Sequence, residues 1–387
     1  MNRNNYIRQY LEDMIPVAFE LETAEEIHVL GTGPARFKVT LKRDLPRREL
    51  MRSTSLALGE AYMRGDLEVD KDLYEVLDLF LGEMAHFKRN DLALSHILHT
   101  SLNPKNQRQQ VASHYDLGND FYKLWLDETM SYSCGYFARE DATLFEAQVG
   151  KVDHILKKLH LKPGMTLLDI GCGWGFLLER AVLHYGVHGV GITLSEEQYK
   201  KIQEDIREKK LEGRMEVKLM DYRELKKSSM TFDRVVSVGM LEHVGRGNYN
   251  TFLEQVRDVL TPGGLFLLHY ISAQKEHGGD PWIRKYIFPG GVIPSFREIV
   301  ELLPDYDFYT LDVESLRRHY TKTLLCWREN FQKNRNRIQT MYGEEFTRMW
   351  ELYLASCAAT FHNGIIDLHQ ILVSKGINNE LPMTRVV

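Results

Sequence analysis

Three glycines alternate with other residues in Gly171-Cys-Gly-Trp-Gly175, and Asp169 precedes the first of them by two positions. The apolar run Met165–Ile170 before this turn is typical of a buried β-strand, and Phe176–Tyr185 after it has the pattern of a helix. Glycines at such a junction allow the backbone to approach a ligand closely at the N-terminus of a helix. The turn therefore predicts a binding site for a nucleotide-like cofactor.

The spacing of the glycines distinguishes between cofactors. A nicotinamide dinucleotide requires GxGxxG, which places its pyrophosphate over the helix, whereas the spacing here is GxGxG. S-adenosylmethionine has no pyrophosphate, and its zwitterionic tail and its ribose need a tight turn with polar groups nearby. The next predicted strands end close to such groups. Thr193 and Gln198 are available to ribose hydroxyls, and the carboxylate of Asp221 and the ring of Tyr222 are available to adenine.

Strand and helix patterns alternate from Gly164 onward, which is the signature of a parallel sheet with helical crossovers. Ser195–Gln198 is a capping box that opens a helix. The expected fold class is α/β with a mostly parallel, Rossmann-like sheet. Further strands are predicted at Val187–Ile192, Met215–Leu219, Phe232–Val238, Leu265–Ile271 and Ile365–Val373, and helices at Tyr249–Leu260, Thr321–Ile338 and Glu344–Phe361.

The first hundred residues follow a different pattern. Period-two alternation predicts one hairpin, and helical spacing predicts two helices, at Glu26–Leu30 with Arg36–Leu41 and at Ser53–Met63 and Asp72–Met84. Asn103–Gln110 is polar and reads as a linker. We therefore expect a smaller N-terminal α+β domain at residues 1–103 and a second domain at residues 104–387.

Basic side chains gather in the N-terminal part of the chain. An anionic lipid surface attracts such a cluster, by about 1 kcal/mol for each charge near the membrane. The alternative is a solvated face without a partner, and the sequence leaves both open. The cluster contains Arg36, Lys38, Lys42, Arg43, Arg47, Arg48 and Arg52.

Bulk composition narrows the function further. The net charge of −5 argues against a general nucleic-acid binder, which normally carries a basic excess. Four cysteines without CxxC spacing predict neither a disulfide framework nor a zinc site, and they suit a reducing cytosol. Met1–Tyr10 lacks the apolar core of a secretory signal, and no stretch approaches the roughly 20 apolar residues that span a bilayer. We expect a cytoplasmic protein whose contact with a membrane is peripheral.

Five longer motifs resemble those of one family, and they are His114–Phe137, Leu167–Gly175, Gly239–Gly245, Leu267–Ile271 and His319–Leu324. They are similar to the cyclopropane-fatty-acid-phospholipid synthase family, and the mycolic acid cyclopropane synthases share them. The resemblance covers the chain from about His114 to its end and implies a class I methyltransferase-like fold. The N-terminal hundred residues, with Gly59–Met63 followed by Gly65, look like the phospholipid branch.

The resemblance implies S-adenosylmethionine as methyl donor and a phospholipid with a cis-unsaturated acyl chain as acceptor. At Asp221-Tyr-Arg223 the chain departs from the pattern, because mycolic members can carry Gly-Trp-Glu there. The implied cofactor contacts are Tyr132, Ser133, Leu167, Leu168, Asp169, Ile170, Gly171, Cys172, Gly173, Trp174, Gly175, Thr193, Leu194, Ser195, Gln198, Asp221 and Tyr222.

An isolated alkene is a weak nucleophile, so this chemistry rests on alignment and on stabilising positive charge in a dry pocket. Aromatic faces stabilise a cation, and Tyr136, Phe137 and Tyr320 are candidates. A base must then remove a proton from the new methyl group so that the ring closes. The family's base, as the resemblance implies, is a bound bicarbonate ion.

The resemblance also implies which groups hold the bicarbonate: Cys134, Glu242, His269, the backbone of Ile271, and Tyr320. His269 and Ile271 fall on the same side of one strand. Glu242 follows the preceding strand, at the edge where open α/β sheets bind ligands. Each residue has a structural alternative: Cys134 and His269 could be core residues, and Glu242 could cap a helix.

Cys357 matches another cysteine of the family, one to which a catalytic role has been assigned. It lies in a helical run of small and apolar residues, where a cysteine is usually part of the packing. The proposed chemistry also needs no covalent adduct. We therefore treat Cys357 as a minor candidate.

A cyclopropane synthase is the favoured function. One alternative is a methyltransferase that acts on oxygen or nitrogen, or that leaves a methyl branch instead of a ring. Another is a lipid-binding protein without catalysis. The resemblance further implies a homodimer at the membrane surface.

Overall fold

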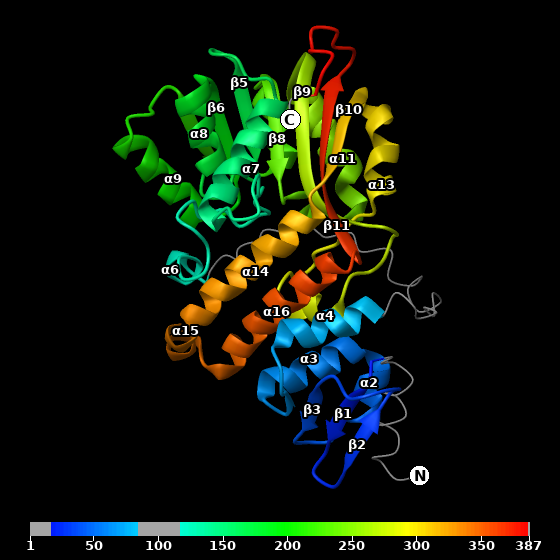
Figure 1. Ribbon diagram of the computed structural model, residues 1–387. Coiled ribbons are helices and arrows are strands. Elements are labelled where there is room, and N and C mark those ends of the chain that lie inside the picture. Colours follow the sequence, from blue (N-terminus) through cyan, green and yellow to red (C-terminus); the bar gives the residue numbers. More distant parts are fainter. Residues whose placement is uncertain (1–16, 84–116, 386–387) are drawn as a thin grey trace. The chain divides into compact units, whose positions relative to one another are not determined.

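The computed structural model describes residues 17–83 and 117–385, which form two compact units (Figure 1). The smaller unit combines residues 17–83 with Gly279–Pro289 and Leu324–Ile365, and the rest belongs to the larger unit. The predicted boundary at 103/104 and the predicted linker lie outside the described residues. The grouping of the two later segments with the N-terminal residues was not anticipated from the sequence.

A four-stranded sheet in the order β2-β1-β3-β4 opens the smaller unit. Strands β2 and β3 occur where alternation predicted them, but the predicted hairpin between them is wrong. Strand β1 lies between the two, antiparallel to β2 and parallel to β3. Its Phe19 and Leu21 are fully buried, so β1 supplies the apolar centre of this sheet. The strands are β1 (Phe19–Glu22), β2 (Ile27–Leu30), β3 (Lys38–Leu41) and β4 (Leu67–Val69).

Helices complete the smaller unit. The two helices predicted near its start are confirmed as α3 and α4, and both pack against α16. Helix α14 begins in the larger unit and ends in the smaller one. The helices are α2 (Arg47–Arg52), α3 (Thr54–Arg64), α4 (Leu73–Glu83), α12 (Pro281–Tyr286), α14 (Arg317–Lys333), α15 (Arg335–Tyr342) and α16 (Glu344–His362).

The motif Gly59–Met63 attaches α12 to α3 within the smaller unit. A Cβ atom at Gly59 would lie 2.4 Å from Cδ1 of Trp282, so a larger residue would displace this indole. Trp282 Nε1 donates to Sδ of Met63 at 3.3 Å, and Lys285 Nζ donates to Oε1 of Glu60 at 2.6 Å. The motif therefore has a structural role in this unit.

A seven-stranded sheet in the order β10-β11-β9-β8-β5-β6-β7 forms the larger unit (Figure 1). Strands β7, β6, β5, β8 and β9 are parallel, and β11 and β10 are added antiparallel. The expected mostly parallel α/β sheet is thus confirmed. The strands are β5 (Thr166–Ile170), β6 (His188–Thr193), β7 (Met215–Leu219), β8 (Phe232–Val238), β9 (Leu260–Ala273), β10 (Phe308–Ser315) and β11 (Ile366–Lys375).

Helices pack apolar side chains onto both faces of this sheet. One face is covered by α7 (Leu144–Lys158), α8 (Phe176–Tyr185) and α9 (Glu196–Glu208). The other is covered by the 3₁₀ helix η4 (Tyr222–Ser228), α11 (Tyr249–Val259) and α13 (Phe296–Leu302). The parallel strands end together at one edge, where ligands bind in sheets of this kind.

The structure also departs from the sequence predictions in the second half of the chain. The helix expected at Thr321–Ile338 is divided at Asn334 into α14 and α15. Residues 261–264, which lie between the predicted helix Tyr249–Leu260 and the predicted strand Leu265–Ile271, are part of β9, where the register against β8 shifts. Strand β10 was not predicted, because it is an edge strand with mostly exposed or half-buried side chains and so lacks a buried alternating pattern.

Candidate active site

The glycine turn connects β5 to α8 in the larger unit. Gly171, Gly173 and Gly175 have φ values of +82°, +55° and +86°, a region that residues with a side chain rarely adopt. A Cβ atom at Gly173 would meet no atom within 4 Å, so this glycine faces open space. Gly175 is the N-cap of α8. The turn therefore exposes its backbone toward a cavity, as its spacing predicts.

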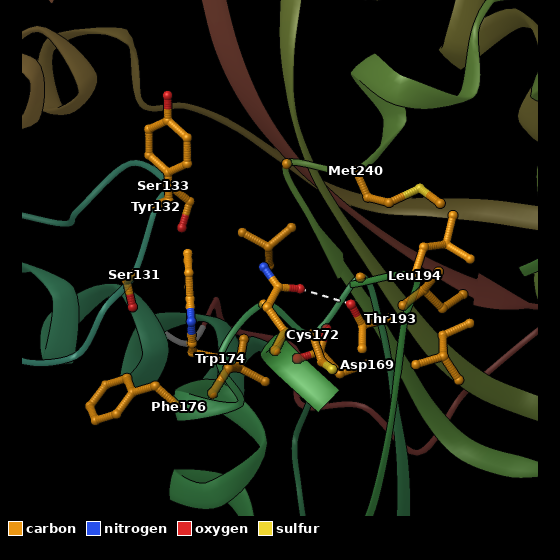
Figure 2. Close-up of a pocket in the computed structure, with 18 of the residues that line it drawn as sticks. Ser131, Tyr132, Ser133, Asp169, Cys172, Trp174, Phe176, Thr193, Leu194 and Met240 are labelled. Carbon is orange, nitrogen blue, oxygen red and sulfur yellow. Dashed lines mark hydrogen bonds between the residues drawn. The ribbon is translucent and has the colours of Figure 1, made fainter. Parts of the chain in front are cut away.

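The cavity lies at the carboxyl ends of the parallel strands, where α/β sheets bind ligands. Figure 2 shows Tyr132, Ser133 and Trp174 on one side of it, and Leu194 and Met240 on the opposite side. Most of the predicted cofactor contacts line it. They are Tyr132, Ser133, Asp169, Ile170, Gly171, Cys172, Gly173, Trp174, Thr193, Leu194, Gln198, Asp221 and Tyr222.

Four predicted cofactor contacts do not line the cavity. Leu167 and Leu168 are fully buried in β5 and belong to the two apolar cores on either side of the sheet. Gly175 caps α8, and the hydroxyl of Ser195 caps α9 by accepting from the N–H of Gln198. These residues support the elements around the cavity: the two leucines pack in the cores, and Gly175 and Ser195 cap helices.

Side chains predicted to meet ribose and adenine are already hydrogen-bonded to each other. Thr193 Oγ1 donates to Oε1 of Gln198 at 2.8 Å, which orients that amide (Figure 2). Asp221 accepts from the N–H and the guanidinium of Arg223, at 3.0 Å and 2.8 Å. Tyr222 is buried, and burial raises the pKa of its hydroxyl to about 12. An adenine would therefore meet an Asp221 carboxylate that Arg223 has partly neutralised.

Two opposite charges line the cavity beside the turn. Burial raises the pKa of the Asp169 carboxyl to about 7, although the Lys151 ammonium opposes this shift. Burial lowers the pKa of Lys151 to about 8, and its Nζ donates to Ser133 Oγ at 3.0 Å. A carboxylate and an ammonium together match the zwitterionic end of S-adenosylmethionine, so the residues fit this ligand.

Lys151 was missed in the sequence analysis, as were Thr129, Ser131, Met240 and His243, which also line the cavity. A signal for Lys151 exists in helix α7. The buried face of this helix carries the polar residues Gln148 and Lys151 among apolar ones. Polar groups on a buried helix face usually have a partner or a ligand.

An aromatic cluster holds the segment before the sheet against the turn. The rings of Tyr122 and Trp174 are 5.4 Å apart, and Tyr132 lies 5.7 Å from Tyr122 and 5.2 Å from Trp125. Trp174 Nε1 donates to Asn119 at 2.9 Å. This packing positions Tyr132 and Ser133 at the cavity. The first residues of the matching motif, 114–116, lie outside the described residues.

Cys134 and Tyr320, two of the predicted bicarbonate ligands, lie in the interior of the larger unit. Burial raises the pKa of the Cys134 thiol, which therefore stays protonated. The thiol donates to the carbonyls of Gly135 at 3.2 Å and Leu316 at 3.8 Å. Tyr320 is in the first turn of α14, and its N–H donates to the carbonyl of Leu316, the residue before this helix. Leu316 thus connects these two residues.

The other predicted ligands surround the end of β9. Glu242, in α10 (Leu241–Val244), accepts through Oε1 from the N–H of Ile271 at 2.7 Å. An ion held by this N–H would have to share it with Glu242. Within the described residues, Oε2 of Glu242 and Nε2 of His269 are buried without a hydrogen-bond partner. Such orphaned atoms are costly, and a bound anion with its own proton could satisfy both.

Burial also sets the protonation of these two groups. It raises the pKa of Glu242 to about 7, despite the opposing hydrogen bond from Ile271. Burial, with a smaller effect of the nearby ammonium groups of Lys151 and Lys158, lowers the pKa of His269 to about 3. His269 is therefore a neutral imidazole at physiological pH, and Glu242 can exchange a proton there.

Two of the aromatic rings predicted to stabilise a cation are already engaged. The Tyr136 ring stacks on His154 at 4.2 Å and on His319 at 4.8 Å. The ammonium of Lys322 lies 4.5 Å from the centre of the Phe137 ring. The third candidate, Tyr320, is buried in the larger unit.

Cys357 lies in α16 and belongs to the smaller unit, whereas the residues described above belong to the larger unit. Its side chain is only partly accessible, and burial raises the pKa of its thiol to about 12. A thiol of this kind is a poor nucleophile, because the thiolate is the reactive form.

We expect the variant Cys357→Ser to keep turnover within about threefold of the wild-type value, because a packing role tolerates this small change. Turnover is measured with S-adenosylmethionine and unsaturated phospholipid vesicles, with Cys326→Ser as the matched control. A near-total loss of turnover with an unchanged circular dichroism spectrum would show that Cys357 is catalytic.

The sheet order, the glycine turn and the cavity at the strand ends define a class I S-adenosylmethionine-dependent methyltransferase. Comparison with known proteins agrees. Residues 102–371 match the family described as mycolic acid cyclopropane synthetase, and residues 5–91 match a domain of unknown function (DUF7884). The chain therefore belongs to the cyclopropane synthase family.

Individual relatives extend this result. Cyclopropane-fatty-acyl-phospholipid synthase of Escherichia coli K12 is 39% identical over 95% of both chains. A probable fatty acid methyltransferase of Pseudomonas putida is 37% identical over 85% of both. The structure of mycolic acid cyclopropane synthase CmaA1, solved with SAH and CTAB, is 37% identical with a TM-score of 0.66 and covers 71% of this chain and 99% of that chain.

Proposed function

We propose that this chain transfers a methylene unit from S-adenosylmethionine to the cis double bond of a phospholipid acyl chain, and so forms a cyclopropane ring. The extent of the sequence match carries the proposal. The E. coli phospholipid enzyme matches 95% of this chain, whereas the mycolic enzyme CmaA1 covers 71%. The N-terminal residues therefore favour a phospholipid over a mycolic substrate.

S-adenosylmethionine supplies an electrophilic methyl group when it is bound. Asp169 and Lys151 would orient its charged tail, and Trp174 and Tyr132 would cover it from the side shown in Figure 2. Methyl transfer would leave positive charge on the acyl chain, which the face of a buried aromatic ring such as Tyr320 would stabilise. Exclusion of water strengthens each of these electrostatic interactions.

Bicarbonate, as the proposed general base, would take the proton that leaves the new methyl group when the ring closes. The residues present fit such an ion, because His269 Nε2 and Glu242 Oε2 are buried polar atoms without partners among the described residues. The pKa of Glu242, raised by burial to about 7, suits a group that passes this proton on.

An assay of the purified full chain tests the proposal. Vesicles of a phospholipid with cis-unsaturated chains are incubated with S-adenosylmethionine, with and without added bicarbonate in carbonate-depleted buffer. We expect S-adenosylhomocysteine, a gain of one CH₂ in the lipid and loss of its alkene proton signals, all stimulated by bicarbonate. Absence of a lipid product would overturn the proposed substrate, and equal rates without bicarbonate would overturn the proposed base.

A second function has support from one relative. The Pseudomonas putida protein is named a probable fatty acid methyltransferase, and a methyl-branched product is the corresponding alternative here. Proton spectra of the product distinguish the two. A ring gives upfield CH₂ signals, whereas a branch gives a methyl signal with alkene protons retained or shifted.

Within residues 17–83 and 117–385, no helix is both long and apolar enough to cross a membrane. We propose peripheral binding from the cytoplasmic side, as a homodimer, through basic residues near the start of the chain. Some of that cluster is already paired: Lys38 with Glu22 at 3.0 Å, and Lys42 with Glu68 at 3.3 Å. The exposed residues Arg36, Arg48 and Arg52 would carry most of the attraction. Analytical ultracentrifugation tests the dimer.

We expect binding to anionic vesicles to weaken by tenfold or more between about 50 mM and about 500 mM salt, because salt screens exposed charges. Sedimentation with vesicles measures it. The double variant Arg48→Glu, Arg52→Glu should bind more weakly at low salt than Lys200→Glu, a control on the larger unit. Salt-independent binding would instead indicate insertion of exposed apolar residues such as Ile27, Val29 and Met51.

A further inference from the structure

A buried amide connects His269 to a lysine on the helix that covers the sheet. Gln370 lies directly opposite His269 in the register of β11 and β9, and its side chain is fully buried. Its Nε2 atom is 3.2 Å from Nδ1 of His269. Its Oε1 atom accepts from Nζ of Lys158 in α7 at 3.0 Å. The Gln370 amide thus bridges the two residues.

Two carboxylates hold Lys158 in place. Its Nζ lies 2.5 Å from Oε2 of Glu314 and 3.3 Å from Oδ2 of Asp312. His154 contacts the same Glu314 oxygen at 2.6 Å. Burial opposes ionisation of Glu314, but the hydrogen bonds from His154 and Lys158 outweigh it and lower the pKa of Glu314 to about 2. Lys158 between two carboxylates is an ammonium, which can only donate hydrogen bonds.

A partner that can only donate determines the orientation of the amide. Oxygen and nitrogen of a glutamine side chain are hard to tell apart by shape, and the hydrogen-bond network decides between them. Here the ammonium of Lys158 requires the oxygen, so the NH₂ group of Gln370 faces His269. Nδ1 of His269 must then accept, and a neutral imidazole with an accepting Nδ1 carries its proton on Nε2.

We propose that Lys158 and Gln370 are positioning residues that lock His269 in the Nε2–H tautomer, so that this N–H is a donor to the anion in the site. Nε2 is buried and has no partner among the described residues, as a donor that awaits a ligand would be. His269 then has no lone pair on Nε2 and does not accept the proton released in the reaction. This assignment rests on the proposed function for the identity of the anion, but the tautomer itself does not.

Nitrogen NMR of the full chain, labelled with ¹⁵N only in histidine, measures the tautomer directly. The His269 signals are identified by their loss in His269→Gln. We expect a neutral ring whose proton is on Nε2, with shifts that move on addition of bicarbonate. A proton on Nδ1 in the wild-type protein would overturn the assignment, whether or not the enzyme makes a lipid product.

Variants of the two positioning residues test whether they fix the tautomer of His269. Lys158→Met removes the donor that orients the amide, whereas Lys158→Arg keeps a donor-only side chain. We expect the methionine variant to populate the Nδ1–H tautomer and to need roughly tenfold or more bicarbonate for half-maximal turnover, since it loses a hydrogen bond to an ion. The arginine variant should keep the Nε2–H tautomer, and its bicarbonate requirement should stay within about threefold of the wild-type value.

Gln370→Met, which keeps length but neither donates nor accepts in this way, should reproduce the effect of Lys158→Met. Thermal melts check that each variant folds, and the wild-type spectrum remains decisive if one does not. If folded Lys158→Met and Gln370→Met keep the wild-type tautomer and bicarbonate dependence, Lys158 and Gln370 do not position His269. If the wild-type protein shows the Nε2–H tautomer but makes no lipid product, the tautomer assignment stands and the proposed function is refuted.

Discussion

Glu242→Gln should lower turnover by on the order of 10²–10³-fold, the range expected when a proton-transfer group is lost. Glutamine keeps the shape of the side chain and the oxygen that accepts from the Ile271 N–H at 2.7 Å. It cannot exchange a proton, whereas the Glu242 carboxyl can, since burial raises its pKa to about 7. Turnover is measured with unsaturated phospholipid vesicles at saturating S-adenosylmethionine.

The affinity for S-adenosylhomocysteine distinguishes lost chemistry from a lost fold. Calorimetric titration should give an affinity for Glu242→Gln within about threefold of wild type, because Glu242 does not line the cofactor cavity. Glu216→Gln removes an exposed carboxyl from strand β7 of the same sheet and is the matched control. Wild-type turnover in folded Glu242→Gln would exclude this carboxyl from the proton pathway.

Asp169→Asn should weaken S-adenosylhomocysteine binding by tenfold or more while it makes the ligand-free protein more stable above pH 7. Under the proposed function the carboxylate at 169 would meet the ammonium of the ligand, and a neutral amide would lose that charge-assisted interaction. The same carboxyl is buried, and burial raises its pKa from an ordinary value near 3.8 to about 7. Its ionisation therefore costs free energy in the ligand-free fold.

The direction of the pH dependence follows from this raised pKa. Between the unfolded pKa, near 4, and the folded pKa, about 7, the folded protein binds the proton more tightly than the unfolded chain. The contribution of Asp169 to the free energy of unfolding is full below pH 4 and is lost as the pH rises through 7. Asparagine does not titrate, so the variant does not lose this contribution as the pH rises. Relative to wild type, Asp169→Asn should gain roughly 3 kcal/mol between pH 5 and pH 8.

Urea unfolding of both proteins at the two pH values measures this gain. Taking the difference between variant and wild type cancels the titration of buried groups that do not interact with Asp169, such as Glu242. A variant that is less stable than wild type at pH 8, by the same margin as at pH 5, would show that Asp169 is ionised and well paired in the ligand-free fold.

Local patterns in the sequence determined the class of the fold and pointed to the cavity at the glycine turn. β7 and β8 have the predicted bounds, and α8 follows the glycine turn as predicted. These elements are readable because each has a short-range cause: an apolar run for a buried strand, a glycine for a positive φ, an apolar stripe for a helix. The pairing of β2 and β3 was wrong because the choice of a partner strand is a non-local property.

The candidate site shows the same division. Glycine spacing and motif resemblance pointed to half of the residues that line the cavity and to Glu242 and His269, but not to Lys151, Lys158 or Gln370. Their importance comes from burial and from partners far along the chain, such as the contact between Lys158 and Gln370. Removal of water makes an unpaired polar group costly and strengthens its hydrogen bonds, and only the packed tertiary structure removes that water. Sequence thus determined which chemistry is available, and the fold decided which groups are charged, which are neutral and which way their hydrogens point.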